Sequence, residues 1–184
     1  MFTKKGRVCK LITGIVFLVM LLCNRCHKQS RENTFLAKYE FEDFSSFKDL
    51  GVFKRGESED GRLIMIDVPY ITNDSLFTGL YLVRLGINDN RIVEAEWVTK
   101  HKNSADTLKL QQVAQSFVKY EISGLEFDGQ GNVFIYLDNF EELSLIRFDN
   151  DTEVERMKAR YDDQHDWERY WKRIRGNWYR SKVR

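Results

Sequence analysis

Short stretches in which apolar and polar residues alternate recur along this chain, and they limit the folds that it can adopt. Residues 63–68 and 80–87 are rich in Leu, Ile and Val, and turn-forming residues precede the first stretch at Asp60-Gly61 and follow the second at 88–90. Strands that follow one another across short turns of this kind pair as antiparallel hairpins. With similar stretches elsewhere, the pattern predicts an antiparallel sheet of six or seven strands.

Residues 35–41 are included in this pattern, because Phe35, Tyr39 and Phe41 fall on one face of an extended chain. They predict a half-buried strand at the start of the domain. Residues 133–137 are apolar throughout, as is typical of a strand that is covered on both faces.

Two other stretches repeat apolar residues with the period of a helix. The first contains Leu110, Val113, Ala114, Phe117 and Val118. It predicts one packed helix at about 105–119, with Ser104 as its N-cap. The second follows residue 150 and spaces its aromatic residues helically up to Trp178, which predicts a helical arm at the C-terminus. Because strands and helices are segregated, we expect an α+β fold.

The N-terminus has the order of an export signal. Four basic residues precede an apolar run from Leu11 to Leu22, and a helix of that length covers roughly 18 Å, well short of the ~30 Å hydrocarbon core of a bilayer. We therefore expect a signal or anchor segment at 1–22, a tether at 23–34 and a single extracytoplasmic domain at 35–184.

Cys23, directly after the apolar run, makes this leader resemble the signal of bacterial lipoproteins, although Leu22 precedes it where that family usually has a small residue. The resemblance implies that Cys23 is lipidated and becomes the mature N-terminus. It also implies a location at the cell membrane or outer membrane, with the domain facing outside the cytoplasm. The alternative is an uncleaved leader that stays in the membrane as an anchor, and both endings tether the domain.

Cys23, Cys26 and His27 also form a C-x-x-C-H sequence, the attachment pattern of c-type haem. A haem carrier is the least favoured alternative, because the leader already accounts for Cys23 and the motif occurs once. We therefore expect no cofactor.

Composition excludes several classes of function. The three cysteines (Cys9, Cys23 and Cys26) all lie in or beside the leader, so the domain has no thiolate nucleophile, disulfide or thiolate metal site. The chain has 29 Lys and Arg residues against 28 Asp and Glu residues, and loss of the four basic residues in 1–22 leaves a net charge of about −3. Nucleic acid is therefore not an expected partner.

Carboxylates supply the only candidate chemistry, since the standard nucleophile, phosphate-binding and zinc motifs are missing from the sequence. Glu94 and Glu96 fall on one face of a strand, with Asp67 on a neighbouring strand, and paired carboxyls can cleave glycosidic bonds. The acidic residues of 128–132 and 162–166 are explained by a turn and by a helix start, so we expect no metal.

The C-terminal segment 169–184 has seven basic residues, no acidic residue and four interleaved aromatic residues. Such a segment can contact anionic lipid, glycan or an acidic protein. The candidate binding residues are Trp171, Trp178, Tyr179, Arg173 and Arg175. Alternatively, these aromatic residues pack on the sheet. The sequence thus predicts a membrane-tethered envelope protein, leaning towards a non-catalytic binding or accessory module with an envelope protein or glycan as its partner, and a carboxylate-based glycan hydrolase is the alternative.

Overall fold

The computed structural model describes residues 31–72, 75–99, 105–161 and 164–182. The chain divides into two compact units, Met1–Glu42 and Asp43–Arg184. The predicted leader, its haem-like motif and Ser104 lie outside the described residues.

In the first unit, residues 31–39 are helical, so the strand predicted at 35–41 is wrong. Phe35 and Tyr39 are four residues apart, and one turn of helix brings their ring centroids to 5.1 Å. Phe35 and Tyr39 fit the period of a strand and also that of a helix, and the structure is helical here. None of the helices in the described part of the chain has the length and apolar character needed to cross a bilayer.

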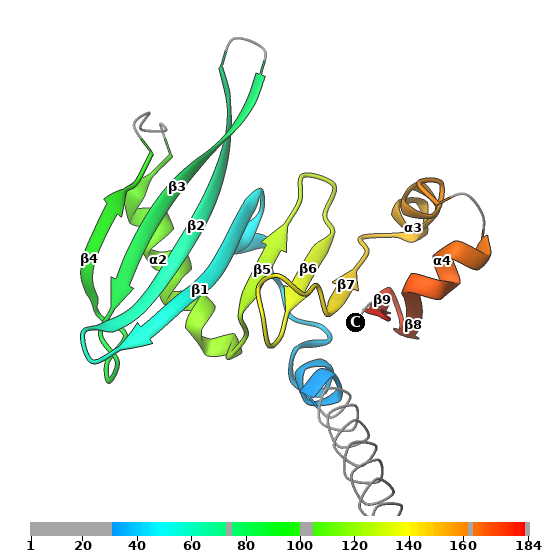
Figure 1. Cartoon of the computed structure of the whole chain (residues 1–184), viewed down its shortest axis with the longest axis horizontal. Helices are drawn as coiled ribbons and strands as arrows, with labels where there is room; N and C mark the ends of the chain where they lie inside the picture. Colours follow the sequence, from blue (N-terminus) through cyan, green and yellow to red (C-terminus); the bar gives the residue numbers. More distant parts are fainter. Residues whose placement is uncertain (1–30, 73–74, 100–104, 162–163, 183–184) are drawn as a thin grey trace, which may run out of the picture. The chain divides into compact units, whose positions relative to one another are not determined.

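The second unit contains one antiparallel sheet in the order β4-β3-β2-β1-β5-β6-β7-β9-β8 (Figure 1). Its strands are β1 Leu50–Ser58, β2 Gly61–Thr72, β3 Ser75–Leu85, β4 Ile92–Trp97, β5 Gly124–Phe127, β6 Val133–Tyr136, β7 Leu145–Arg147, β8 Trp171–Arg175 and β9 Trp178–Ser181. The helices are α2 Thr107–Phe117, α3 Asp151–Lys158 and α4 Gln164–Tyr170, with 3-10 turns η1 Ser45–Phe47 and η2 Val118–Tyr120. The α+β class is confirmed, whereas six or seven strands is too few for the nine found in the described residues.

The two extra strands come from the C-terminal segment that was predicted to be helical. The helix α4 ends at Tyr170, and β8 and β9 then form a hairpin in which Arg173 pairs with Tyr179. Gly176 in the turn has a φ of +48°, a left-handed conformation that glycine adopts without a steric penalty. The sequence pattern is also compatible with Gly176 as a helix cap, but glycine equally permits the turn of a hairpin.

The predicted central helix is confirmed as α2. Its N-cap is Asp106 and not Ser104, so that part of the prediction is wrong: the carboxylate of Asp106 accepts hydrogen bonds from the backbone N–H groups of Leu108 (2.9 Å) and Lys109 (3.3 Å). The buried residues Leu110, Val113, Ala114 and Phe117 form the apolar stripe of this helix, and α2 contacts β2, β3 and β4.

The register of the strands sorts their side chains onto two faces, because directly paired residues point to the same side of a sheet. Val52 pairs with Ile66 and with Leu125, and all three are buried on the face that α2 covers. Their neighbours in sequence, Gly51, Asp67 and Glu126, consequently lie on the opposite face.

At the other end of the sheet, this opposite face is covered by α3 and α4. An apolar cluster forms there from Ile146, Phe148, Val154, Trp167, Trp171 and Tyr179. The cluster has no member on β1, β2 or β5, where Asp67 and Glu126 lie.

Candidate functional site

A pocket of about 570 Å³, here called the hairpin pocket, lies where α4 meets β8 and β9. Its apolar lining is formed by Trp167, Trp171 and Tyr179. The rings of Trp167 and Trp171 stack with their centroids 5.8 Å apart, and the indole N–H of Trp171 donates to the hydroxyl of Tyr161 at 2.7 Å. All three lining rings are at least nine-tenths buried, so they shape the pocket and offer a ligand little ring surface.

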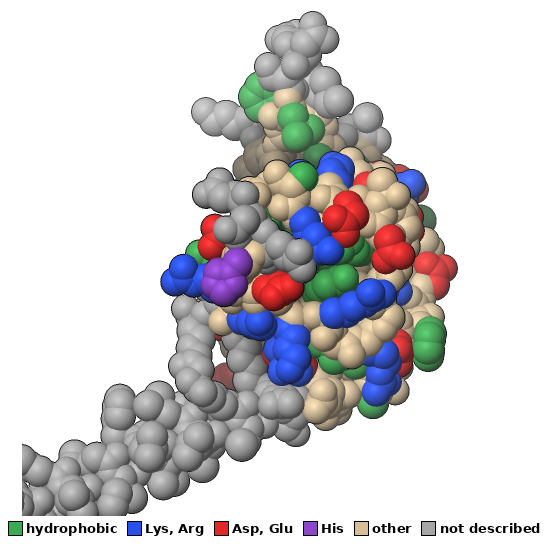
Figure 2. All heavy atoms as spheres, turned by 90° about the vertical axis from the view of Figure 1, so that its right-hand side faces the viewer, with side chains coloured by type: hydrophobic (Ala, Val, Ile, Leu, Met, Phe, Trp, Pro, Cys, Tyr) green, Lys and Arg blue, Asp and Glu red, His purple; other side chains and the backbone are tan. Residues whose placement is uncertain are grey.

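Cationic side chains surround these rings. Among the described residues, the lining of the hairpin pocket includes the cations Lys158, Lys172, Arg173 and Lys182 and the carboxylate of Glu168. Figure 2 faces the right-hand side of Figure 1 and shows Lys and Arg side chains gathered around a small apolar area, with carboxylates among them. Four cations around one concavity make it attractive to an anion.

Several of these cations are held in place by neighbouring groups. The guanidinium of Arg173 donates to the carbonyl of Gly176 at 2.7 Å and lies over the ring of Tyr179. Lys182 donates to the carbonyl of Glu168. Lys158 donates to the carboxylate of Glu155 at 2.8 Å, and this hydrogen bond raises the pKa of the ammonium group. Neighbouring groups thus fix the positions of Arg173, Lys182 and Lys158 at the pocket.

The binding residues predicted from sequence fall into two groups. Trp171, Arg173 and Tyr179 line the hairpin pocket, whereas Trp178 and Arg175 do not. Trp178 is buried on the face that α2 also covers, beneath the guanidinium of Arg147. The alternation of a β-hairpin sends Trp178 and Tyr179 to opposite sides, which a helical spacing does not anticipate.

A second pocket, of about 330 Å³, is here called the glycine pocket because Gly51 is among its lining residues. Gly51 on β1 pairs with Asp67 on β2 and with Glu126 on β5. A β-carbon on Gly51 would lie 3.3 Å from Cβ of Asp67 and 3.4 Å from Cγ of Glu126. Cβ of Asp67 and Cγ of Glu126 consequently lie within about 7 Å of each other, so the two acidic side chains are neighbours across Gly51.

The two carboxyls have different surroundings. Burial raises the pKa of Asp67, the charge of Glu126 raises it further, and Arg55 partly opposes both effects. Oδ1 of Asp67 is buried and has no hydrogen-bond partner in the described part of the chain. Burial also raises the pKa of Glu126, but its Oε1 accepts a 3.0 Å hydrogen bond from the hydroxyl of Tyr136, which favours the ionised form.

The carboxylate pair chosen from sequence lies elsewhere. Glu94 and Glu96 are exposed on β4, at the edge of the sheet, and Glu94 forms an ion pair with Arg84 at 3.3 Å. Asp67 was recognised in the sequence, but Glu126 and Tyr136 were missed. The alternation in residues 124–127 indicates a strand. That Glu126 lies near Asp67, however, follows only from the pairing of β5 with β1.

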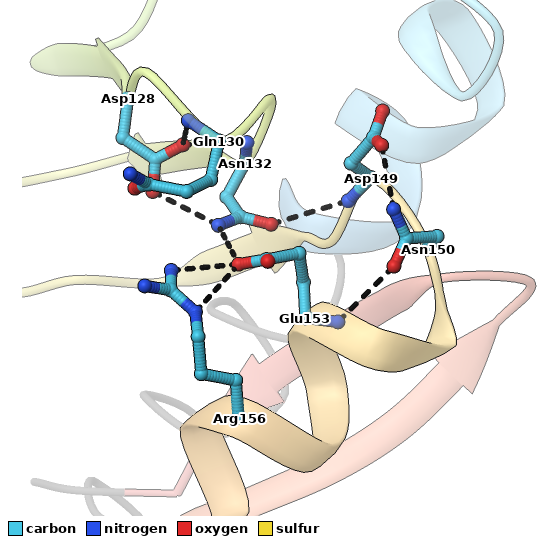
Figure 3. A network of polar contacts seen from close by, with 7 residues as sticks. All are labelled: Asp128, Gln130, Asn132, Asp149, Asn150, Glu153 and Arg156. Atoms are coloured by element: carbon cyan, nitrogen blue, oxygen red, sulfur yellow. Dashed lines mark hydrogen bonds and ion pairs between the residues drawn. The ribbon is translucent and has the colours of Figure 1, made fainter.

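The turn at 128–132 is stabilised by its own hydrogen bonds (Figure 3). Oδ1 of Asp128 accepts from the backbone N–H of Gln130 (3.0 Å) and of Asn132 (2.8 Å). The buried amide of Asn132 donates to Asp128 and to Glu153, and its oxygen accepts from the backbone N–H of Asp149. This network fastens the β5–β6 turn to the start of α3, which is a structural role.

Within the described residues, no group of three or more His, Cys, Asp or Glu side chains has an arrangement suited to a metal ion. His165 is exposed on α4, and Asp162 and Asp163 lie outside the described residues.

Comparison with known proteins gives no match to a family model, to a curated protein or to a solved structure. The geometry of the two pockets is therefore the basis for any assignment of function.

Proposed function

We propose that this chain is a membrane-tethered binding module of the bacterial envelope, whose hairpin pocket binds an acidic glycan outside the cytoplasm. The observation that carries the proposal is the arrangement of Lys158, Lys172, Arg173 and Lys182 around one pocket. The leader supports the location, because its resemblance to a lipoprotein signal implies an anchor at Cys23, and an uncleaved leader would also tether the domain.

The shape of the pocket favours a glycan over the other anionic partners. Its volume lies in the range of ~300–1,000 Å³ that is usual for small-ligand sites, so it suits a short segment of a polymer. A protein partner normally buries ~800 Å² on each side. A membrane surface would require exposed aromatic rings, whereas Trp171 and Tyr179 are buried.

The hairpin pocket acts by binding, because its lining offers cations and ring edges but no nucleophile beside a base. Charge–charge attraction of this kind weakens as salt is added, since the Debye length falls to about 3 Å at 1 M. The proposal therefore predicts affinity for acidic polysaccharides that falls with ionic strength, and little affinity for neutral ones.

The test is a titration of the full chain in detergent micelles with fluorescent polygalacturonate, and with neutral dextran as the comparison. We expect the double substitution Lys172→Glu and Arg173→Glu to weaken polygalacturonate binding by about tenfold or more, because each reversal places a carboxylate at the pocket. Arg91→Glu combined with Lys109→Glu changes the net charge equally on exposed positions away from the pocket and is the matched control. Equal losses in the two double variants, or equal binding of dextran, would contradict the proposal.

A further inference from the structure

The glycine pocket contains a pair of carboxyls that the binding function does not use. We propose that Asp67 and Glu126 are the general acid and the general base of a second site, which hydrolyses a glycosidic bond. Three observations carry this proposal. Both residues line one cavity, Cβ of Asp67 and Cγ of Glu126 lie within about 7 Å of each other across Gly51, and the buried Oδ1 of Asp67 has no hydrogen-bond partner in the described part of the chain. Paired carboxyls on neighbouring positions are the arrangement that glycoside cleavage uses.

Gly51 gives room to the ring of Phe53 beside the two acids. A β-carbon at this position would also lie 2.9 Å from the ring of Phe53, closer than such atoms normally approach. Any larger residue on β1 would therefore stand between Asp67 and Glu126. A side chain is therefore excluded at position 51, and the cavity beside Gly51 is lined by both Asp67 and Glu126.

The charge of the pocket selects the type of reaction. Besides Asp67 and Glu126, its lining includes Asp49 and Asp128, and it contains no Lys, Arg or His. Acyl and phosphoryl transfer develop negative charge in the transition state, which such a lining would destabilise. Glycoside cleavage instead passes through a positively charged, oxocarbenium-like transition state, which an acidic pocket stabilises. For the same reason, the sugar at the cleaved bond is neutral or carries an amine.

The surroundings of the two carboxyls assign their roles. The buried Oδ1 of Asp67 has no hydrogen-bond partner in the described part of the chain, and burial raises the pKa of this carboxyl, so Asp67 is assigned as the acid. Glu126 accepts the hydroxyl of Tyr136, which favours its ionised form, so it acts as the base. The pKa of Tyr136 is itself raised by burial and by the charge of Glu126, so the phenol keeps its proton and remains a donor.

In the proposed step, a water molecule attacks the anomeric carbon while Glu126 takes one of its protons. The bond from the anomeric carbon to the glycosidic oxygen breaks, and its electron pair stays on that oxygen, which takes the proton of Asp67. The products are a hemiacetal and an alcohol. Return of the proton from Glu126 to Asp67 through solvent restores the starting state.

The test measures hydrolysis of aryl glycosides of neutral and amino sugars by the full chain in detergent. We expect Asp67→Asn to lower kcat/KM about 100-fold or more when the leaving group is a poor one, because such a group needs the acid. With a dinitrophenyl leaving group, which departs without protonation, the same variant should lose less than about tenfold. A merely structural role for Asp67 would lower both rates equally.

The base is tested separately. Glu126→Ala should lose about 100-fold or more in turnover, and added azide should restore turnover and give a glycosyl azide. Tyr136→Phe removes the hydrogen bond to Glu126, so the acid limb of the pH profile should move to higher pH. The other charged groups that face the pair are Arg55 and Asp49 from β1 and its start, and Asp128 after β5; they are unchanged in this variant.

Glu94→Gln and Glu96→Gln are the matched controls, since both remove an exposed carboxylate from β4 outside the glycine pocket. They should leave hydrolysis unchanged. Absence of hydrolysis by the unmodified chain across the panel would overturn the proposal, and so would equal losses in Asp67→Asn and Glu94→Gln. The hairpin pocket is assayed by polysaccharide binding and the glycine pocket by hydrolysis, so the failure of one proposed site is distinguishable from the failure of the other.

Discussion

Asp67 and Glu126 bear a cost of burial in the sheet. Burial raises the pKa of both carboxyls, so each ionised group is less favourable in the folded protein than in the unfolded chain. Stability is therefore lost as the pH rises from the ordinary carboxyl pKa of about 4 through the raised values. Residues kept at such a cost are typical of functional sites.

This argument predicts that Asp67→Asn and Glu126→Gln each raise the free energy of unfolding at pH 7–8, since the amide carries no charge to bury. The gain should vanish below about pH 4, where the carboxyls are protonated in both states. Guanidinium unfolding at pH 7–8 and below about pH 4, followed by tryptophan fluorescence, measures this gain in the free energy of unfolding. Glu94→Gln, on an exposed residue, should stay within about 0.5 kcal/mol of the unmodified chain, and a gain of equal size there would argue against specific burial at Asp67.

At the scale of single elements, Gly176 distinguishes the observed hairpin from the helix that the sequence pattern predicted. It has a φ of +48°, and a β-carbon added to it would have no neighbouring atom within 4 Å. An added β-carbon meets no neighbour but strains the backbone, so Gly176→Ala should lower the free energy of unfolding by about 1 kcal/mol. In a continuous helix, the same substitution would stabilise the protein by about 1 kcal/mol, because alanine is the better helix former.

Urea unfolding of this variant gives the sign of the effect. Gly56→Ala is the matched control, because Gly56 on β1 also has open space but lacks a positive φ. It should be neutral or slightly stabilising, since alanine reduces the entropy of the unfolded chain. A stabilising Gly176→Ala would show that the turn between β8 and β9 does not form.

The elements that could be predicted are those in which local pattern and tertiary position agree. The stripe of α2 and the turn at Gly61 are each compatible with one structure, and both were predicted correctly. Phe35–Tyr39 and Trp171–Trp178 fit two periods at once, and their sequence does not decide between them. The same limit applies to the pockets, because Asp67 and Glu126 are adjacent only through pairing with Gly51.

For the whole molecule, the two proposed activities share one requirement, which is that the domain is held outside the cytoplasm. That proposed location rests on the charge pattern of the leader and on the position of Cys23. The two pockets provide no evidence for it. An anchored domain needs only modest affinity for a polymeric glycan, because tethering raises the effective concentration of the site at the envelope.

The anchor is tested by the intact mass of the protein extracted from its native membrane. We expect a mature chain that begins at Cys23 and carries a diacylglyceryl group, because the thiol after the apolar run is the atom that the lipoprotein pathway modifies. Cys23→Ser should leave a full-length chain without lipid, and Cys26→Ser, the matched control, should change only its own side-chain mass. A full-length, unmodified mass for the natural sequence would instead establish an uncleaved anchor, and an added haem mass would assign Cys23 and Cys26 to a redox cofactor and remove the lipoprotein proposal.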